Sequence, residues 1–243
     1  MIHYFLDDAG DDRAAPPLLA LPIGEKEPLR LAFVWNLAVE LARRGVRPSL
    51  HVPEASSLRD LLPAPAVGGV LAPELVLCGA RTLPDFQRDV ARAARPARGD
   101  ALRLGIVPCE WVAEPADARA AADLFRWTLL FAAPDPTDLE AVGDLAARLS
   151  DAVPGGVLGV TIHAVESVAE AKGAFERLAG PFEAKKGRPL RSYGLLLDDL
   201  LVYRGVVERR PVVLSHPQSL AARALADLAG LVLADARDLG TRP

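Results

Sequence analysis

The chain has 243 residues, of which 51% are hydrophobic and 25% are charged, and this is the composition of a globular domain with a sizeable core. The net charge of −4, without a basic run, excludes a sequence-independent nucleic-acid footprint, and no apolar stretch reaches the roughly 18 residues that a membrane span needs. Cys78 and Cys109 are too few for a disulfide framework or a complete zinc site, and the histidines lack metal-ligand spacing. We therefore expect a cytoplasmic protein that binds neither metal nor nucleic acid.

The amino-terminal part of the chain predicts an acidic leader, then a strand, a loop and a helix. Residues 1–16 are acidic after Leu6 and predict a leader outside the folded domain. The apolar run Leu18–Ile23 follows two prolines and predicts a buried strand. Apolar residues recur at helical spacing from Leu29 onward, and Gly45 follows a basic last turn, which predicts a helix. In a doubly wound α/β fold, phosphates bind at the loop between such a first strand and first helix.

Strands and helices alternate along the rest of the chain. This alternation predicts an α/β fold with a doubly wound, mostly parallel sheet and helices on both faces. We assign a single domain to residues 17–229 and a short tail to residues 230–243. The further strands are expected at 47–52, 74–78, 102–107, 127–133, 156–162, 193–197 and 211–214, and the further helices at 83–94, 115–125, 137–149, 167–178, 200–208 and 217–228. Residues 56–62 predict a short helix or a turn, residues 63–73 a loop and residues 185–191 a basic loop.

The loop after the first strand has the position of a phosphate-binding loop but not its residues. Such a loop needs glycines whose N–H groups point at the anion, a lysine for the outer phosphates and a Ser or Thr hydroxyl for magnesium. Here a single glycine is followed by two carboxylates, which repel phosphate, and by Pro28, which has no N–H. The degenerate positions are Gly24, Glu25, Lys26, Glu27, Arg30 and Leu31.

Three segments of the sequence carry a resemblance to a known family. Residues 33–45 read FVWNLAVELARRG and are similar to NLAVALAKRG, which follows the phosphate loop in the MinD/ParA class of P-loop ATPases. Residues 129–145, LLFAAPDPTDLEAVGDL, and residues 197–229, which include RRPVVLSHPQSLAARALADLA, resemble two later segments of that family in the same order. The chain most resembles the FlhG (FleN) branch, which regulates flagellar placement and number, and the resemblance covers residues 18–228.

The resemblance locates the nucleotide-binding positions of the family in this sequence. In the family's phosphate loop, K-G-G-x-G-K-[ST], the signature lysine corresponds to Glu25, the Walker lysine to Arg30 and the magnesium hydroxyl to Leu31. Arginine keeps the charge of the Walker lysine but not its compact ammonium group. The loop glycines correspond to Lys26, Glu27 and Leu29.

The remaining catalytic positions of the family are also changed. The D-x-D motif that orients the attacking water corresponds to Val52 and Glu54. The Walker B aspartate corresponds to Pro108 or Cys109, neither of which is a usable magnesium ligand. The positions near the nucleotide base correspond to His163, Leu197 and Asp199.

These changes predict a pseudo-ATPase without catalytic residues, metal or cofactor, since phosphoryl transfer depends on positioning and charge stabilisation. We expect a regulatory or scaffolding module that binds a protein, such as an intact paralogue or a component of a flagellar, pilus or polarity system. Without ATP as the link between subunits, the chain is expected to be a monomer or a nucleotide-independent homodimer. Residues 230–243 lack the basic amphipathic helix of MinD-type proteins, so no stable membrane anchor is expected.

Two alternatives remain open. In the first, an enzyme or ligand-binding protein reuses the crevice at the switch point of the sheet for another small molecule, and a crevice filled by Leu29, Leu31 and Trp35 would argue against it. In the second, residual ATP binding drives dimerisation.

Taken singly, Arg30 is interpreted as a solvated first-turn arginine, and His163 as a histidine at a strand end whose hydrogen bonds are satisfied. The polar residues that the first alternative requires to converge are Arg30, Glu54, Glu110, His163 and Asp199.

Overall fold

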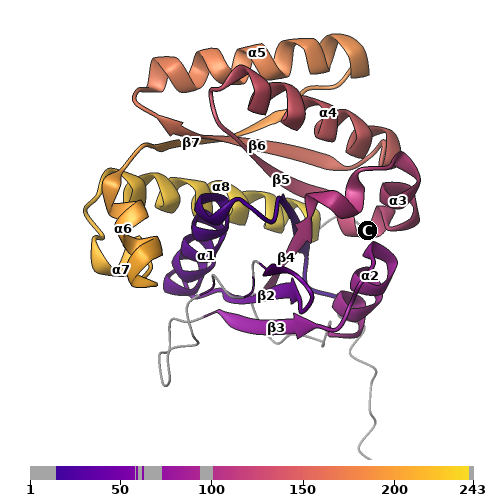
Figure 1. The fold of residues 1–243 in the computed structure, drawn as a ribbon, viewed down its shortest axis with the longest axis horizontal. Coiled ribbons are helices and arrows are strands. Elements are labelled where there is room, and N and C mark those ends of the chain that lie inside the picture. Colours follow the sequence, from indigo (N-terminus) through magenta and orange to yellow (C-terminus); the bar gives the residue numbers. More distant parts are fainter. Residues whose placement is uncertain (1–14, 58, 60–61, 63–72, 94–100, 241–243) are drawn as a thin grey trace, which may run out of the picture.

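The computed structural model of this chain describes residues 15–57, 59, 62, 73–93 and 101–240. In this part of the chain, seven parallel strands form one sheet in the order β3-β2-β4-β1-β5-β6-β7 (Figure 1). The predicted fold class is confirmed, whereas most of the predicted leader and of the loop at 63–73 lies outside the described residues. The strands are β1 (Leu18–Ile23), β2 (Arg47–Pro53), β3 (Glu74–Cys78), β4 (Ala101–Pro108), β5 (Trp127–Ala132), β6 (Val157–Val165) and β7 (Arg191–Leu197).

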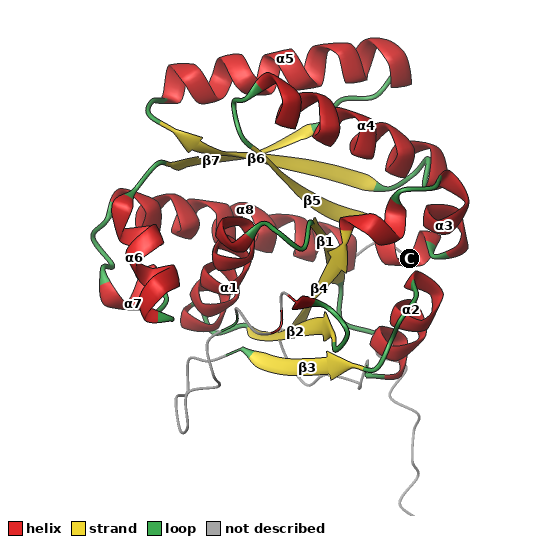
Figure 2. Ribbon diagram, in the orientation of Figure 1, coloured by secondary structure: helices red, strands yellow, loops and turns green. Residues whose placement is uncertain are grey.

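Helices cover both faces of the sheet, as Figure 2 shows. Helices α1, α6, α7 and α8 pack on one face and α2 to α5 on the other, so that the buried side chains form two cores. None of the helices in the described ranges combines the length and the apolar character of a membrane span. The helices are α1 (Pro28–Arg43), α2 (Leu83–Arg92), α3 (Pro115–Ala120), α4 (Pro136–Ala152), α5 (Val168–Lys186), α6 (Leu200–Glu208), α7 (Val212–Ser215) and α8 (Leu220–Gly240), with 3-10 turns η2 (Cys109–Val112) and η3 (Ala122–Phe125).

Strand β1 lies in the middle of the sheet, between β4 and β5. Leu19, Leu21 and Ile23 belong to the core under α1 and Ala20 to the opposite core, as the alternation of a strand requires. A strand that is buried on both faces consists of a continuous run of apolar residues, and this run is what predicts β1 in the sequence. Its parallel register pairs Ile23 with Pro108, so the loops after β1 and β4 leave the sheet at the same edge.

The segment 211–214, predicted as a strand, forms the short helix α7 instead, and that prediction is wrong. The backbone N–H of Val213 donates to Oδ1 of Asn36 at 3.2 Å. Asn36 is buried on α1, where its side-chain amide donates to the carbonyl oxygen of Ala32 at 2.8 Å. The apolar run packs against α1 because a buried side-chain oxygen on that helix, rather than a neighbouring strand, accepts the backbone N–H of Val213.

The basic segment 185–191, predicted as a loop, connects two elements over residues 187–190, and the prediction is wrong at both ends. Lys186 closes α5, and Gly187 ends that helix with φ +65°. Nζ of Lys186 lies 2.6 Å from Oδ1 of Asp151 on α4. Arg191 begins β7. The glycine stops the helix in the left-handed conformation that helix ends favour, and only a few residues remain as a connection.

Helix α8 continues well beyond residue 229, so the predicted end of the domain falls inside this helix. Its Asp235 is buried, accepts a hydrogen bond from the hydroxyl of Tyr193 and pairs with Arg191. The hydroxyl of Tyr193 in turn accepts a hydrogen bond of 2.8 Å from Nε1 of Trp127. This run of polar contacts ties β5, β7 and α8 together inside the core.

We predict that Tyr193→Phe lowers the free energy of unfolding by about 1–3 kcal/mol, because it leaves the buried N–H of Trp127 without its acceptor and Oδ2 of Asp235 without the hydroxyl that donates to it. Urea denaturation followed by circular dichroism measures the change. Tyr203→Phe makes the same substitution at an exposed tyrosine and is the control, expected to cost less than about 0.5 kcal/mol. Equal costs for the two variants would show that the buried contacts contribute nothing.

Candidate functional site

Glu27 closes the loop between β1 and α1 on itself. Its backbone N–H donates to the carbonyl oxygen of Gly24 at 3.1 Å, and its side-chain Oε2 accepts the N–H of Gly24 at 2.7 Å. A Cβ on residue 24 would lie 3.0 Å from that oxygen, so glycine permits the close approach. A second loop donor, the N–H of Glu25, points to Oε1 of Glu110 at 3.4 Å. Backbone donors that a phosphate loop offers to an anion are thus directed at carboxylates of the chain itself.

Arg30, in the first turn of α1, is the centre of the site, and its side chain is only 11% exposed. Its Nη1 lies 2.7 Å from Oε1 of Glu27, its Nη2 lies 2.5 Å from Oδ1 of Asp138, and its Nε donates to Nε2 of His163 at 3.2 Å. The interpretation of Arg30 as a solvated arginine is therefore wrong. Burying a guanidinium requires acceptors that replace water, and two carboxylates and a ring nitrogen supply them here.

Asp138 joins this site from α4, and the sequence analysis missed it. Oδ1 of Asp135 accepts the N–H groups of Thr137 and Asp138, so Asp135 caps the helix and places Asp138 in its first turn. Oδ2 of Asp138 accepts the N–H of Ala133 at 2.6 Å, which leaves Oδ1 for Arg30. The sequence DPTD signals a capped helix, but nothing in it indicates a partner 108 residues away.

His163 lies near the carboxyl end of β6 and is 6% exposed. The pKa of this histidine is lowered from 6.5 to about 4, chiefly by burial and also by the charge of Arg30, while Asp138 opposes the shift. The ring is neutral at neutral pH, as it must be to accept a hydrogen bond from Arg30. Within the described ranges its Nδ1 has no hydrogen-bond partner, so the histidine is buried at a strand end with only one of its two ring nitrogens hydrogen-bonded.

The other polar residues singled out in the sequence do not converge on Arg30. Asp199 caps two helices, because its Oδ1 accepts the N–H of Leu201 in α6 and its Oδ2 that of Ala221 in α8. Glu54 is exposed and lies 3.7 Å from Arg59. Among the five residues that the crevice alternative requires, hydrogen bonding within the described part of the chain joins only Arg30 and His163 to each other.

The positions that correspond to magnesium ligands in the family are apolar or protonated here. Leu31 is 2% exposed and belongs to the core under α1, as does Trp35. Burial raises the pKa of the Cys109 thiol to about 12, and the nearby charges of Glu27 and Glu110 add to the effect. Such a thiol stays protonated and is a poor nucleophile and metal ligand. In the described ranges, no three His, Cys, Asp or Glu side chains are grouped so as to hold a metal ion.

No family model matches the sequence, and no curated protein does. Solved structures do match the fold. A chain of the MinC:MinD cell division complex of Aquifex aeolicus has 14% identity and a TM-score of 0.65, with 90% of this chain and 96% of that chain covered. MinD of Pyrococcus horikoshii with Mg-ADP has 15% identity and a TM-score of 0.58, covering 93% and 99%. ParA of pNOB8 bound to nonspecific DNA has 9% identity and a TM-score of 0.61, covering 93% and 99%. The chain therefore has the fold of MinD/ParA P-loop ATPases.

We predict that His163 makes stability depend on pH. Its pKa is lower in the folded chain than in the unfolded one, so the unfolded state binds the proton first and the free energy of unfolding falls as the pH drops from about 6.5 toward 4. Between pH 7.5 and 5 one such histidine contributes a loss of about 2 kcal/mol. In His163→Gln the loss measured by urea denaturation should be smaller by that amount.

The matched control for this prediction is His51→Gln, because burial also lowers the pKa of His51 to about 4. Each single variant should remove a similar part of the pH dependence. An unchanged loss in His163→Gln, together with a reduced loss in His51→Gln, would contradict the prediction for His163.

Proposed function

We propose that this chain is a divergent MinD/ParA-type protein that neither binds nor hydrolyses ATP and acts as a regulatory or scaffolding partner of another protein. The observation that carries the proposal is the position of the Glu27 carboxylate, which accepts the N–H of Gly24 and pairs with Arg30. In P-loop proteins, the backbone N–H groups and the basic side chain of this loop face the phosphates. An internal carboxylate takes the place of the ligand anion.

A nucleotide phosphate would have to compete with this arrangement. Two like charges about 4 Å apart repel each other by about 4 kcal/mol near a protein surface, so phosphate is disfavoured beside Glu27. Each of the three side-chain nitrogens of Arg30 already has a partner, and Leu31 stands where the magnesium hydroxyl is needed. The residues present do not fit a magnesium nucleotide.

Exposed apolar side chains support the protein-binding part of the proposal. Of the eight large apolar side chains that are exposed in the described ranges, five lie between Leu200 and Leu220, on α6, α7 and the start of α8. These elements lie side by side next to α1 (Figure 1). Apolar side chains gathered at one place on a surface indicate a site for a protein partner. The five residues are Leu200, Tyr203, Val207, Leu214 and Leu220.

The similar structures include a protein–protein complex and a complex with nonspecific DNA. For this chain the net charge of −4 favours a protein over DNA, since binding to the phosphate backbone requires an excess of positive charge. The resemblance to the FlhG branch directs the search for the partner to an intact paralogue or to a flagellar, pilus or polarity system in the cytoplasm. In the proposal the chain is a monomer or a nucleotide-independent homodimer.

Isothermal titration calorimetry of the full chain with MgATP tests the proposal. We predict no heat of binding up to about millimolar nucleotide, and an unchanged molar mass in light scattering when MgATP is added. Binding at micromolar affinity would overturn the proposal. Binding accompanied by a doubling of the mass would establish the alternative, an ATP-dependent dimer.

Glu27→Gly is the matched variant, because it removes the internal carboxylate and leaves every other residue of the loop as it is. It is expected not to bind MgATP either, since Leu31 still provides no hydroxyl for the metal. Nucleotide binding by this variant alone would show that Glu27 is the sole obstacle and that the lost metal ligand is not needed.

A further inference from the structure

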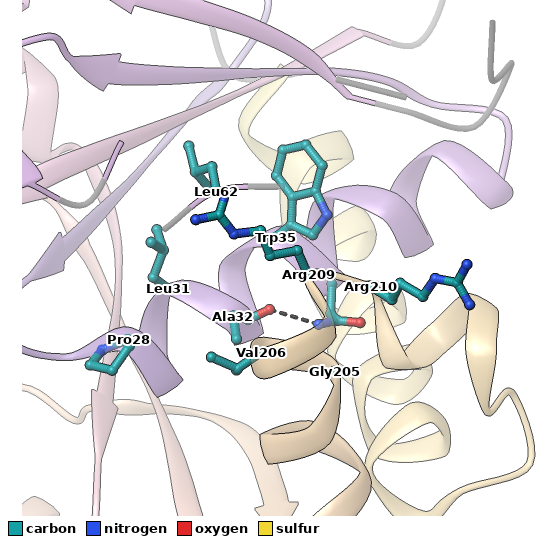
Figure 3. A pocket seen from close by; sticks show the side chains of 10 residues that line it. Pro28, Leu31, Ala32, Trp35, Leu62, Gly205, Val206, Arg209 and Arg210 are labelled. Atoms are coloured by element: carbon teal, nitrogen blue, oxygen red, sulfur yellow. Dashed lines mark hydrogen bonds between the residues drawn. The ribbon is translucent and has the colours of Figure 1, made fainter. Parts of the chain in front are cut away.

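Helix α6 has an inner side that is packed and an outer side that is not. On the inner side, Val202 and Gly205 are buried. Val206 and Ala32 line the narrow space between α6 and α1, and Arg210, just beyond the end of α6, extends away from that space (Figure 3). The fold thus uses one side of α6 for its core and leaves the other side available to a partner.

The outer side of α6 carries an apolar stripe. Leu200, Tyr203 and Val207 stand at positions i, i+3 and i+7, so their side chains fall on one face of the helix. Leu200 is 82% exposed, Val207 is 84% exposed and Tyr203 is 42% exposed. Apolar side chains at this spacing are those with which one helix packs on another helix.

The charges along α6 are divided between its two ends. Asp198, which is exposed, lies just before the helix, and Arg210, which is also exposed, lies just after it. Between them, Nε of Arg204 lies 2.7 Å from Oε1 of Glu208, so these two charges neutralise each other within the helix. One end of the outer side is therefore acidic and the other end is basic, and such a surface is complementary to a copy of itself that runs in the opposite direction.

An antiparallel pair of α6 helices satisfies the stripe and the ends together. If Leu200 of one copy faces Val207 of the second copy, the same register sets Tyr203 against Arg204 of the second copy, where the guanidinium can stack on the phenol ring. The acidic end of each helix then lies beside the basic end of the other. A two-fold axis repeats each of these contacts. A parallel pair would bring like charges together instead.

We propose that the outer side of α6 binds the same side of a second copy of this chain, with the two helices antiparallel about a two-fold axis. The inference rests on the proposed function for the absence of a nucleotide between the subunits. Leu214 on α7 and Leu220 on α8 extend the apolar surface beside α6. The division of charge favours a second copy over an unrelated protein, because a two-fold contact requires a surface that is complementary to itself.

Sedimentation velocity of the full chain without nucleotide tests the proposal. A contact made by short helices is small, so we expect dissociation at about micromolar concentration. Between about 1 and 100 μM, the molar mass should rise from 25.8 kDa toward twice that value. A chain that is still monomeric at the upper concentration would overturn the inference and leave the proposed function standing. A mass that doubles only after MgATP is added would overturn both.

Val207→Asp places a charge in the middle of the contact and should keep the chain monomeric over the same range. Because this side chain is exposed in a single copy, the circular dichroism spectrum of the variant should be that of the native chain. Val168→Asp is the matched control, since it makes the same change at a valine on α5 that is 68% exposed, and it should dimerise like the native chain. A dimer that survives Val207→Asp, or that both variants lose equally, is incompatible with the proposal.

Reversal of the charges at the two ends tests the two-fold contact. Asp198→Arg and Arg210→Asp each bring like charges together and should raise the dissociation constant about tenfold or more. The double variant exchanges the two charges and should restore the dissociation constant to within about threefold of the native value. If the two losses add in the double variant, these ends do not face each other and the proposal fails.

Disulfide crosslinking tests the antiparallel register. Leu200→Cys and Val207→Cys should each remain uncrosslinked on mild oxidation, whereas a mixture of the two variants should give a covalent dimer. The native thiols do not interfere, because burial raises the pKa of Cys78 to about 11 and that of Cys109 to about 12. Crosslinking of Val207→Cys by itself would indicate parallel helices and would refute the arrangement.

Discussion

The buried guanidinium of Arg30 is the constraint on which the candidate site depends. Moving a cation out of water costs several kcal/mol, so the folded chain must surround it with anions and hydrogen-bond acceptors. Glu27 supplies one from the loop after β1, Asp138 supplies another from the first turn of α4, and neutral His163 supplies a third from β6. Glu27 follows β1, Asp138 follows β5 and His163 lies near the end of β6, and these three strands are neighbours in the sheet. The contacts that neutralise Arg30 therefore fix the relative positions of the carboxyl ends of the three strands.

The same constraint accounts for the chemistry of the loop. In MinD/ParA folds this edge of the sheet is where an anion is expected, because backbone N–H groups and the amino end of α1 point there. The chain places its own carboxylate of Glu27 at these donors. Under the proposed function, this internal carboxylate holds the loop in place without a nucleotide.

Helix α6 shows how one short element serves both the core and the surface. Val202 and Gly205 face inward, and the carbonyl oxygen of Arg210 lies so close to Gly205 that an added Cβ would be 2.7 Å from it. This tight return of the chain ends the helix, while Leu200 and Val207 remain exposed on the solvent side. The end of α6 therefore combines a closely packed turn and an apolar surface within a few residues.

The sequence by itself determined the parallel α/β fold and most elements, because buried strands and amphipathic helices leave periodic apolar patterns that depend on neighbours in the chain. It also located the loop that begins at Gly24, between β1 and α1. It did not determine that 211–214 is helical, since that depends on an acceptor on Asn36, 177 residues away. Nor did it show that Arg30 is buried or that Asp138 pairs with it. Burial and ion pairing depend on which strand ends meet, and only the tertiary structure decides that.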